Sequence, residues 1–404
     1  MSKIRIGNSF DKQDTTMTQG WKPVRIGDIC KTNQQTYSVS EKWSFVNYLD
    51  TGNITENRIN EIQYLVTGKN TLPSRARRKV YIDDILYSTV RPNQRHYGII
   101  KDMLPNMLVS TGFAVISVDK AVADSDFLYY YLSQDDVVEN LHAIGEQSVS
   151  AYPSIKPSDI ESLELMLPPL EEQREIGRIL RVLDDKLSNN TAINHHLEQM
   201  AQAIFKSWFV DFEPFADSEF IDSEFGKIPM GWQVGTLSEL ITVKYGKDHK
   251  KLANGSIPVF GSGGIMRFVD IALYRNESVL IPRKGTLNNV IYVNQPFWSV
   301  DTMFYTEMNR LNLAKFVYFF VRSKDLASMN TGAAVPSMTT EILNTLPVVI
   351  PPDEELARFE EIVGTQFAQI QDNLRENDTL SFLRDTLLSR LMSGELSVAN
   401  HAAK

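Results

Sequence analysis

The sequence predicts an α+β fold in which two β-rich domains stand in tandem, each followed by a long α-helix. The first observation is an internal repeat. Residues 167–208 and 350–391 align without a gap at a constant difference of 183 positions, as for Pro168 and Pro351 (351 − 168). The second is an apolar stripe at helical spacing in both stretches. The third is a set of short β-rich runs before each stretch. We therefore interpret the chain as a tandem duplication.

The two copies differ mainly in the middle of their domains. Residues 1–19 are polar and are expected to form an N-terminal arm, before a first domain at 20–166. Trp21 and Trp232 open the two copies 211 positions apart (232 − 21), whereas Phe127 and Phe316 differ by 189 (316 − 127). The first copy therefore holds 22 extra residues (211 − 189) before Phe127. Such variation is typical of a fixed scaffold that carries different surface loops.

Short strands are expected in both domains, because runs rich in β-branched and aromatic residues are bounded by turn residues. These runs occupy 44–49, 85–90, 112–117, 257–260, 279–281, 290–293 and 304–305, and short helices are expected at 124–133 and 313–323. The Gly-Ser-Gly-Gly run at 261–264 resembles a dinucleotide loop but lacks a following helix, so a tight turn is favoured. The paired tryptophans are expected to anchor the cores rather than to stack on bases.

A central helix is expected at 167–210 and a C-terminal helix at 351–394. Each begins at a Pro-Pro pair followed by acidic residues, which suit the positive end of a helix dipole. The length of the apolar stripe indicates a coiled-coil seam, whereas the alternative is two amphipathic helices that pack only on their own domains. The expected pairing positions are Ile179, Leu180, Leu187, Leu197, Ile204, Ile362, Val363, Ile370, Leu380 and Leu387.

Polar residues recur at matching places on the two predicted helices: Asn190 and Asn194 match Asn373 and Asn377. Asparagine at a seam costs stability but fixes the register of the helices. An acidic linker is expected at 211–229, followed by a second domain at 230–350 and, after the C-terminal helix, a tail at 395–404.

Composition suits an ordinary globular protein of two or three domains. The single cysteine, Cys30, excludes an internal disulfide framework, and no run approaches the length of a membrane span. We therefore expect a cytoplasmic protein. A net charge of −9 argues mildly against nucleic-acid binding. This average, however, conceals strong local segregation of charge.

No catalytic or metal site is expected. The chain has no Asn-Pro-Pro-Tyr-type methyltransferase motif, no phosphate-binding loop and no Cys/His cluster with zinc spacing. The six histidines are scattered, and His195 and His196 are expected to face solvent.

Basic patches in both domains are the strongest binding signal. Eight bases and only two acids lie between Lys69 and Lys101, and a second group follows Lys244. Such patches suit phosphate contacts, with some arginines left to reach guanine edges, although a solvated charged loop is the alternative. The candidate DNA-binding residues are Lys69, Arg75, Arg77, Arg78, Lys79, Arg91, Arg95, Lys244, Lys247, Lys250, Lys251, Arg283 and Lys284.

The chain resembles the specificity subunit of a type I restriction–modification system over nearly its whole length. The motifs that carry this resemblance are Leu-Pro-Pro-Leu-Glu-Glu-Gln-Arg-Glu-Ile at 167–176, Ala-Ile-Phe-Lys-Ser-Trp-Phe-Val-Asp-Phe at 203–212, Ile-Pro-Val-Phe-Gly-Ser-Gly-Gly-Ile at 257–265 and Phe-Val-Asn-Tyr-Leu-Asp-Thr-Gly-Asn-Ile at 45–54. The second copy departs from the pattern at Leu356, where glutamine is usual.

The resemblance implies two target-recognition domains and an antiparallel, pseudo-twofold coiled coil of the two spacer helices. It implies that each domain reads one half of a split site in double-stranded DNA. It also implies two methyltransferase subunits, which carry S-adenosylmethionine, and motor–nuclease subunits, with ATP and Mg on these partners. The alternatives are a coiled-coil adaptor with two domains that do not bind DNA, and a modification or restriction polypeptide with its own activity.

Overall fold

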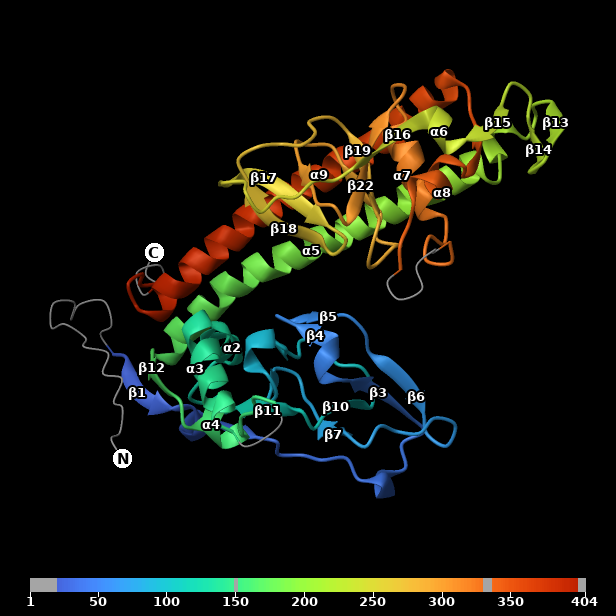
Figure 1. Cartoon of the computed structure of the whole chain (residues 1–404). Coiled ribbons are helices and arrows are strands. Elements are labelled where there is room, and N and C mark those ends of the chain that lie inside the picture. Colours follow the sequence, from blue (N-terminus) through green and yellow to red (C-terminus); the bar gives the residue numbers. More distant parts are fainter. Residues whose placement is uncertain (1–19, 149–151, 330–335, 399–404) are drawn as a thin grey trace, which may run out of the picture. The chain divides into compact units, whose positions relative to one another are not determined.

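The computed structural model describes residues 20–148, 152–329 and 336–398 (Figure 1). The expected N-terminal arm and the end of the expected tail, from 399 onward, lie outside these residues. The chain divides into two compact units, one formed by 1–189 with 376–404 and the other by 190–375. Each unit therefore contains one domain and parts of both long helices.

The first domain is built on a four-stranded sheet with the order β2-β11-β8-β9. Its strands are β2 (Cys30–Thr32), β11 (Phe113–Val118), β8 (Ile85–Ser88) and β9 (Tyr97–Ile99). The start and end of the domain meet where β1 (Lys22–Arg25) pairs antiparallel with β12 (Glu164–Leu167). The helices of this domain are α1 (Ile26–Ile29), α2 (Ser125–Ser133), α3 (Asp135–Glu146) and α4 (Pro157–Glu161).

A second sheet lies within the extra length of the first domain. Its order is β6-β3-β10-β7, and β10 pairs parallel with β3 but antiparallel with β7. These strands are β6 (Gln63–Val66), β3 (Phe45–Leu49), β10 (Met107–Ser110) and β7 (Ala76–Lys79), and a small hairpin joins β4 (Ile54–Thr55) to β5 (Arg58–Ile59).

The second domain repeats the framework of the first. Its main sheet has the equivalent order β16-β22-β19-β20, and β15 pairs with β23 as β1 does with β12. These elements are α6 (Leu237–Leu240), α7 (Ala314–Arg322), α8 (Thr340–Asn344), β15 (Gln233–Thr236), β16 (Ile241–Tyr245), β19 (Ser278–Pro282), β20 (Ile291–Val293), β22 (Met303–Met308) and β23 (Pro347–Ile350). The starts of α1 and α6 differ by 211 (237 − 26), those of α2 and α7 by 189 (314 − 125), and those of α4 and α8 by 183 (340 − 157).

The domains differ where the sequence differs in length. The second sheet of the second domain has three strands in the order β18-β17-β21, namely β18 (Gly264–Val269), β17 (Asn254–Gly261) and β21 (Trp298–Ser299). The run at 261–264 is the turn of the β17–β18 hairpin, with Gly264 at a φ of +110°, as the sequence predicts. Helix α3 has no counterpart among the described residues of the second domain and is absent from the sequence prediction.

The long helices are α5 (Leu170–Phe209) and α9 (Asp353–Met392), drawn in green and red in Figure 1. In the first unit Arg384 pairs with Asp184 at 2.9 Å and Lys186 with Glu376 at 3.0 Å. In the second unit Asn373 donates a hydrogen bond to Asn194 over 2.7 Å. A second contact there joins Phe205 to Phe359, whose ring centroids lie 6.3 Å apart. Within each unit, partner numbers fall on α9 as they rise on α5, so the two helices run antiparallel in both units. The prediction of paired helices is confirmed.

The expected pairing positions differ in burial. Leu180, Leu187 and Val363 are buried. Six positions are partly buried, namely Ile179, Leu197, Ile204, Ile370, Leu380 and Leu387. Ile362 is instead 42% exposed, because the adjacent Val363 faces the core in its place. His195 and His196 are exposed, as expected.

The segment expected as a linker at 211–229 is ordered as a hairpin of β13 (Phe220–Ser223) and β14 (Gly226–Pro229). Phe215 and Ile228 are buried in the core of the second unit, and this burial holds the segment against the domain. The tryptophans anchor the cores as predicted: Trp21 is 8% and Trp232 4% exposed.

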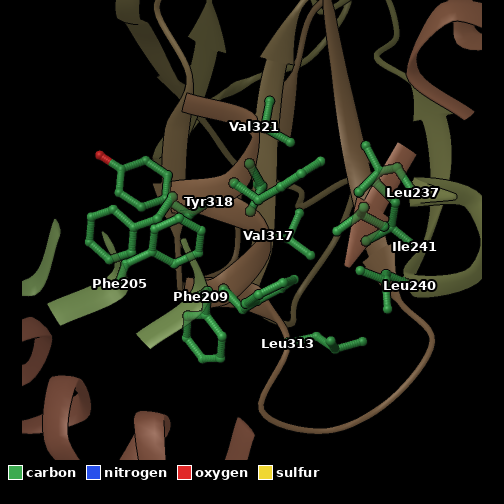
Figure 2. Close-up of a cluster of buried hydrophobic side chains, with 14 of the residues drawn as sticks. Phe205, Phe209, Leu237, Leu240, Ile241, Leu313, Val317, Tyr318 and Val321 are labelled. Atoms are coloured by element: carbon green, nitrogen blue, oxygen red, sulfur yellow. The ribbon is translucent and has the colours of Figure 1, made fainter. Parts of the chain in front are cut away.

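The core of the second unit joins its helix halves to its domain. Figure 2 shows Phe205 and Phe209 of α5 beside Val317 and Tyr318 of α7 within this cluster. The ring centroids of Phe209 and Phe316 lie 4.9 Å apart. Burial of such aromatic side chains contributes strongly to stability. The domain and its helix halves therefore share one hydrophobic core.

Candidate nucleic-acid interface

The turn after β8 and the turn after β19 occupy equivalent places in the two domains. Val90 forms a β-bridge with Ser154, and Lys284 forms one with Ser337. The amide of the next residue then donates to a proline carbonyl: Arg91 to Pro153 over 2.8 Å, and Gly285 to Pro336 over 3.3 Å. We call these segments the β8 turn (residues 89–95) and the β19 turn (residues 283–289), since 283 − 89 and 289 − 95 are both 194.

Backbone conformation supports this equivalence. Arg91 has a φ of 48° and Gly285 a φ of +87°, so both adopt the left-handed conformation. Glycine adopts it without cost, whereas a long side chain such as arginine rarely does. Strained residues of this kind cluster at functional sites. Arg91 is therefore a candidate functional residue on conformational grounds as well as on charge.

Each turn places an arginine against an exposed tyrosine. The guanidinium carbon of Arg91 lies 4.4 Å from the ring centroid of Tyr152, and that of Arg283 lies 5.3 Å from the ring centroid of Tyr245. The tyrosines are 56% and 52% exposed. Stacking on an aromatic face orients a guanidinium and leaves N–H donors at its edge. In Arg283, Nη1 donates to the carbonyl of Asp301 over 3.1 Å, so the remaining donors are the ones that can reach a ligand. This arrangement can present hydrogen-bond donors to a base or a phosphate.

Lysines lie in the loop between β16 and β17 and in the β19 turn. Lys247, Lys250, Lys251 and Lys284 are exposed, whereas Lys244 forms an ion pair with Glu307 at 3.6 Å. The backbone of Lys247 is anchored, because its amide donates to Ser299 over 2.7 Å and its carbonyl accepts from the indole of Trp298 over 2.9 Å. A fixed backbone with free ammonium groups suits contacts to phosphates.

The other basic residues of the first domain lie on and beside β7. Lys69 and Arg75 are exposed, and Arg77 and Arg78 are half-buried on β7. The Nε atom of Arg78 is buried without a hydrogen-bond partner among the described residues, and burial lowers the pKa of this side chain. Lys79 differs from them, because its Nζ atom lies 2.5 Å from Glu41.

The side chain of Arg95 is directed toward acidic residues of its own domain, unlike the side chain of Arg91. It pairs with Asp135 at 2.5 Å and Glu56 at 3.5 Å. It lines a cavity of about 540 Å³ together with Tyr130 and Asp184. Burial alone would lower the pKa of Arg95, but hydrogen bonds to Asp135 and Tyr97 raise it above its ordinary value. The ion pairs of Arg95 therefore direct its guanidinium toward carboxylates of its own domain.

Two tyrosines of this candidate interface, Tyr152 and Tyr245, are absent from the sequence-based candidates. Tyr245 directly follows a candidate lysine, so its position could have drawn attention to it. Tyr152 lies 61 positions after Arg91 (152 − 91), and no local pattern links the two residues.

The described part of the chain offers no cluster of metal-ligating side chains. Within residues 20–148, 152–329 and 336–398, no group of three or more His, Cys, Asp or Glu side chains is placed to hold a metal ion. Burial raises the pKa of the Cys30 thiol to about 12, which keeps it protonated and unreactive at neutral pH. No helix in these ranges is long and apolar enough to cross a membrane.

Comparison with known proteins points to one family. The family model described as the type I restriction modification DNA specificity domain matches residues 18–199 and 229–382. The type I restriction enzyme HindI specificity subunit of Haemophilus influenzae is 25% identical over 461 residues, covering 93% of this chain and 99% of that protein. The MjaIX specificity subunit of Methanocaldococcus jannaschii is 27% identical over 438 residues, covering 98% and 99%.

The fold has a similar solved counterpart. The crystal structure of the S subunit of a type I restriction–modification system from M. genitalium matches with a TM-score of 0.57 at 17% identity. The match covers 96% of this chain and 98% of that one. At this level of identity the likeness concerns the fold alone.

Proposed function

Because this chain belongs to the type I restriction–modification DNA specificity family and is a specificity subunit that recognises DNA sites, we propose that its two domains each read one half of a split target. The observation that carries this proposal is the equivalence of the β8 and β19 turns. Each of these equivalent turns presents an arginine supported by an exposed tyrosine. The arginines occupy different positions within the turns, since Arg91 aligns with Gly285 rather than with Arg283.

We assign different roles to the basic residues. Arg91 and Arg283 contact base edges, because an oriented guanidinium can donate two hydrogen bonds to guanine in the major groove. Contacts to phosphates fix the position of the protein on DNA whatever the DNA sequence. We assign them to the lysine and arginine side chains that are exposed or partly buried. These are Lys69, Arg75, Arg77, Arg78, Lys247, Lys250, Lys251 and Lys284. Lys79, Arg95 and Lys244 support the surface through their ion pairs.

We also propose that the long helices dock partner subunits. Exposed apolar side chains occur along both helices, with Met200 55%, Leu374 46% and Phe382 76% exposed. Apolar and aromatic residues of this kind are enriched at protein interfaces. The partners are two methyltransferase subunits and the motor–nuclease subunits of a type I complex. S-adenosylmethionine, ATP and Mg belong to these partners, and this chain supplies DNA recognition.

Domain exchange tests whether the domains read independently. Residues 20–150 are replaced by those of another family member, and the methylated DNA motif is mapped in cells that also carry the methyltransferase. We expect one half of the motif to change, because the second domain keeps its own reading turn. A motif that changes in both halves would contradict independent reading.

Salt dependence tests DNA binding itself. The chain, assembled with its methyltransferase, is titrated with random duplex DNA at several salt concentrations. Affinity should fall steeply with salt, because basic side chains displace counterions from phosphates. Absence of any salt-dependent binding would instead favour an adaptor that does not contact DNA.

A further inference from the structure

An ion-pair cluster joins the first domain to its own long helix. Asp126, in the first turn of α2, lies 2.9 Å from Lys101 and 3.1 Å from Arg181 of α5. Lys101 also lies 2.7 Å from Asp83, just before β8. The side chains of Lys101, Asp126 and Arg181 are only 19–29% exposed. We call Lys101, Asp126 and Arg181 the first clamp.

A cluster of opposite polarity joins the second domain to α9. Lys315, in the first turn of α7, pairs with Glu277 at 3.3 Å and with Glu360 of α9. Its side chain is 5% exposed, and its ammonium group lies 5.3 Å from the ring centroid of Tyr292. A lysine buried to this degree requires paired charges. We call Glu277, Lys315 and Glu360 the second clamp.

The central residues of the two clamps are equivalent. Asp126 and Lys315 differ by 189 positions (315 − 126), the difference between α2 and α7, so one framework position holds opposite charges. An acidic residue precedes β8 and β19 in both domains. Asp83 and Glu277 differ by 194 positions (277 − 83), the same difference as between the β8 turn and the β19 turn.

The long helices carry a matching exchange of glycine and charge. At the helix difference of 183, Glu360 aligns with Gly177 (360 − 183), and Gly364 aligns with Arg181 (364 − 183). Each helix therefore holds one charged residue and one glycine, one turn apart and in opposite order.

Gly177 also makes room for the first domain. A Cβ atom there would lie 3.0 Å from Cβ of Asp126 and 3.1 Å from the amide of Phe127. Helix α2 therefore packs directly against this glycine, where α9 instead carries the Glu360 side chain. The two helices thus offer docking surfaces that differ in shape as well as in charge.

We infer that the two clamps make each domain specific for its own helix. If Asp126 docked on the aligned surface of α9, it would face Glu360, and Gly364 would take the place of Arg181. On the aligned surface of α5, Lys315 would face Arg181. Both exchanges bring like charges together in half-buried surroundings, where repulsion is poorly screened. The clamps therefore exclude docking on the helix of the other copy, within this chain or in a second molecule.

Apolar packing alone could not make this choice. The aligned residues Ile176 and Phe359 are both buried, as are Leu180 and Val363. Hydrophobic attraction has no direction, so a duplicated stripe accepts either domain unless another interaction discriminates. The inference concerns assembly of the chain and does not depend on DNA recognition.

Exchange of the central residues in the full chain tests the clamps without altering composition or net charge. In the variant Asp126→Lys with Lys315→Asp, both clamps hold like charges. We expect its melting temperature to fall by roughly 5 °C or more, with early proteolytic release of the domains. Arg181→Glu with Glu360→Arg should behave alike. The variant with all four substitutions restores opposite charges between each domain and its helix. It should recover part of the loss, because Lys101 and Glu277 still face a side chain of their own sign.

A matched control exchanges Glu175 and Arg178 on α5, which form an exposed pair within one helix turn. This control should melt like the parent chain. If a double exchange does not fold, the melting temperatures of Asp126→Asn and Lys315→Met still measure the contribution of each clamp separately. The fourfold variant still tests whether opposite charges between domain and helix restore stability. Double exchanges as stable as the parent, or a fourfold variant no more stable than the doubles, would overturn the inference.

Discussion

At the scale of single residues, Arg91 and Arg95 show how similar positions can have different roles. Both flank the short helical turn Pro92–Gln94 in the left-handed conformation, with φ values of 48° and 55°. Arg91 stacks on an exposed tyrosine, whereas Arg95 forms ion pairs with Glu56 and Asp135. We therefore expect substitutions at the two positions to affect different properties of the protein.

Replacing Arg91 by alanine should cost about 1–3 kcal/mol of binding free energy on the specific site alone, if its guanidinium contacts a guanine. Replacing Arg77 should instead weaken specific and random DNA alike and reduce the salt slope by about one. Titration of both duplexes at several salt concentrations separates these outcomes. Equal losses on both duplexes for both variants would refute the division of roles.

Replacing Arg95 by alanine should lower the free energy of unfolding by about 0.5–1 kcal/mol, because its acidic partners are substantially exposed and solvent screens the ion pairs. The ratio of specific to random DNA affinity should stay unchanged. Denaturant unfolding of the full chain measures the first effect, with Arg91→Ala as the control that keeps parental stability. A loss of sequence discrimination in Arg95→Ala would assign this residue to reading instead.

At the scale of elements, the helix pair combines an apolar stripe with a polar contact. Asn373 is 5% exposed and donates to Asn194 over 2.7 Å, while Gln369 donates to Asn373 over 2.9 Å. Asn194 and Asn373 are not aligned in the repeat (373 − 194 is 179, not 183). They meet because the helices are antiparallel, so the contact specifies one register of the pair.

Replacing Asn373 alone by leucine should destabilise the chain by about 1–3 kcal/mol, because Asn194 loses its partner at a largely buried seam. Replacing both asparagines by leucine should recover much of this stability, since neither asparagine is then left without the other and the exposed Gln369 can bond to water instead. A double-mutant cycle by denaturant unfolding measures this coupling. Additive effects of the two substitutions would show that the contact does not stabilise the pair.

At the scale of the whole molecule, we expect the helix pair to set the distance between the two half-sites. Each helix has 40 residues and therefore extends about 60 Å at about 1.5 Å per residue. Because each helix contributes a part to each unit, we expect the unread spacer in the DNA to be fixed in length.

Inserting seven residues after Leu187 and seven after Arg375 should lengthen this spacer by up to about three base pairs, because a heptad adds about 10 Å. These points face one another, since Lys186 pairs with Glu376 on one side and Asn194 with Asn373 on the other. The seam therefore stays in register. Mapping the methylated motif is the measurement. An active complex with an unchanged spacer would contradict the ruler, and changed half-site bases would show that the helices also shape the reading domains.

The sequence by itself determined the duplication, both long helices and most strands of the main sheets, because periodicity and turn residues act over short distances. It missed α3, the hairpin at 220–229 and several strands outside the main sheets, among them β6, β7 and β10. The hairpin forms because Phe215 and Ile228 are buried against the second domain, and an acidic segment gives no local sign of that burial.

Only the tertiary structure decided which basic residues remain available to a ligand. Tyr152 stacks on Arg91, and Asp135 forms an ion pair with Arg95. In both pairs the two residues are far apart in the sequence, and the tertiary structure brings them together. The same holds for the clamps. Asp126 and Lys315 form their ion pairs with the long helices only because the tertiary structure places each beside its helix. Charge and aromatic character can be read from a sequence. Which side chains contact one another depends on the tertiary structure, because the partners are far apart in the sequence.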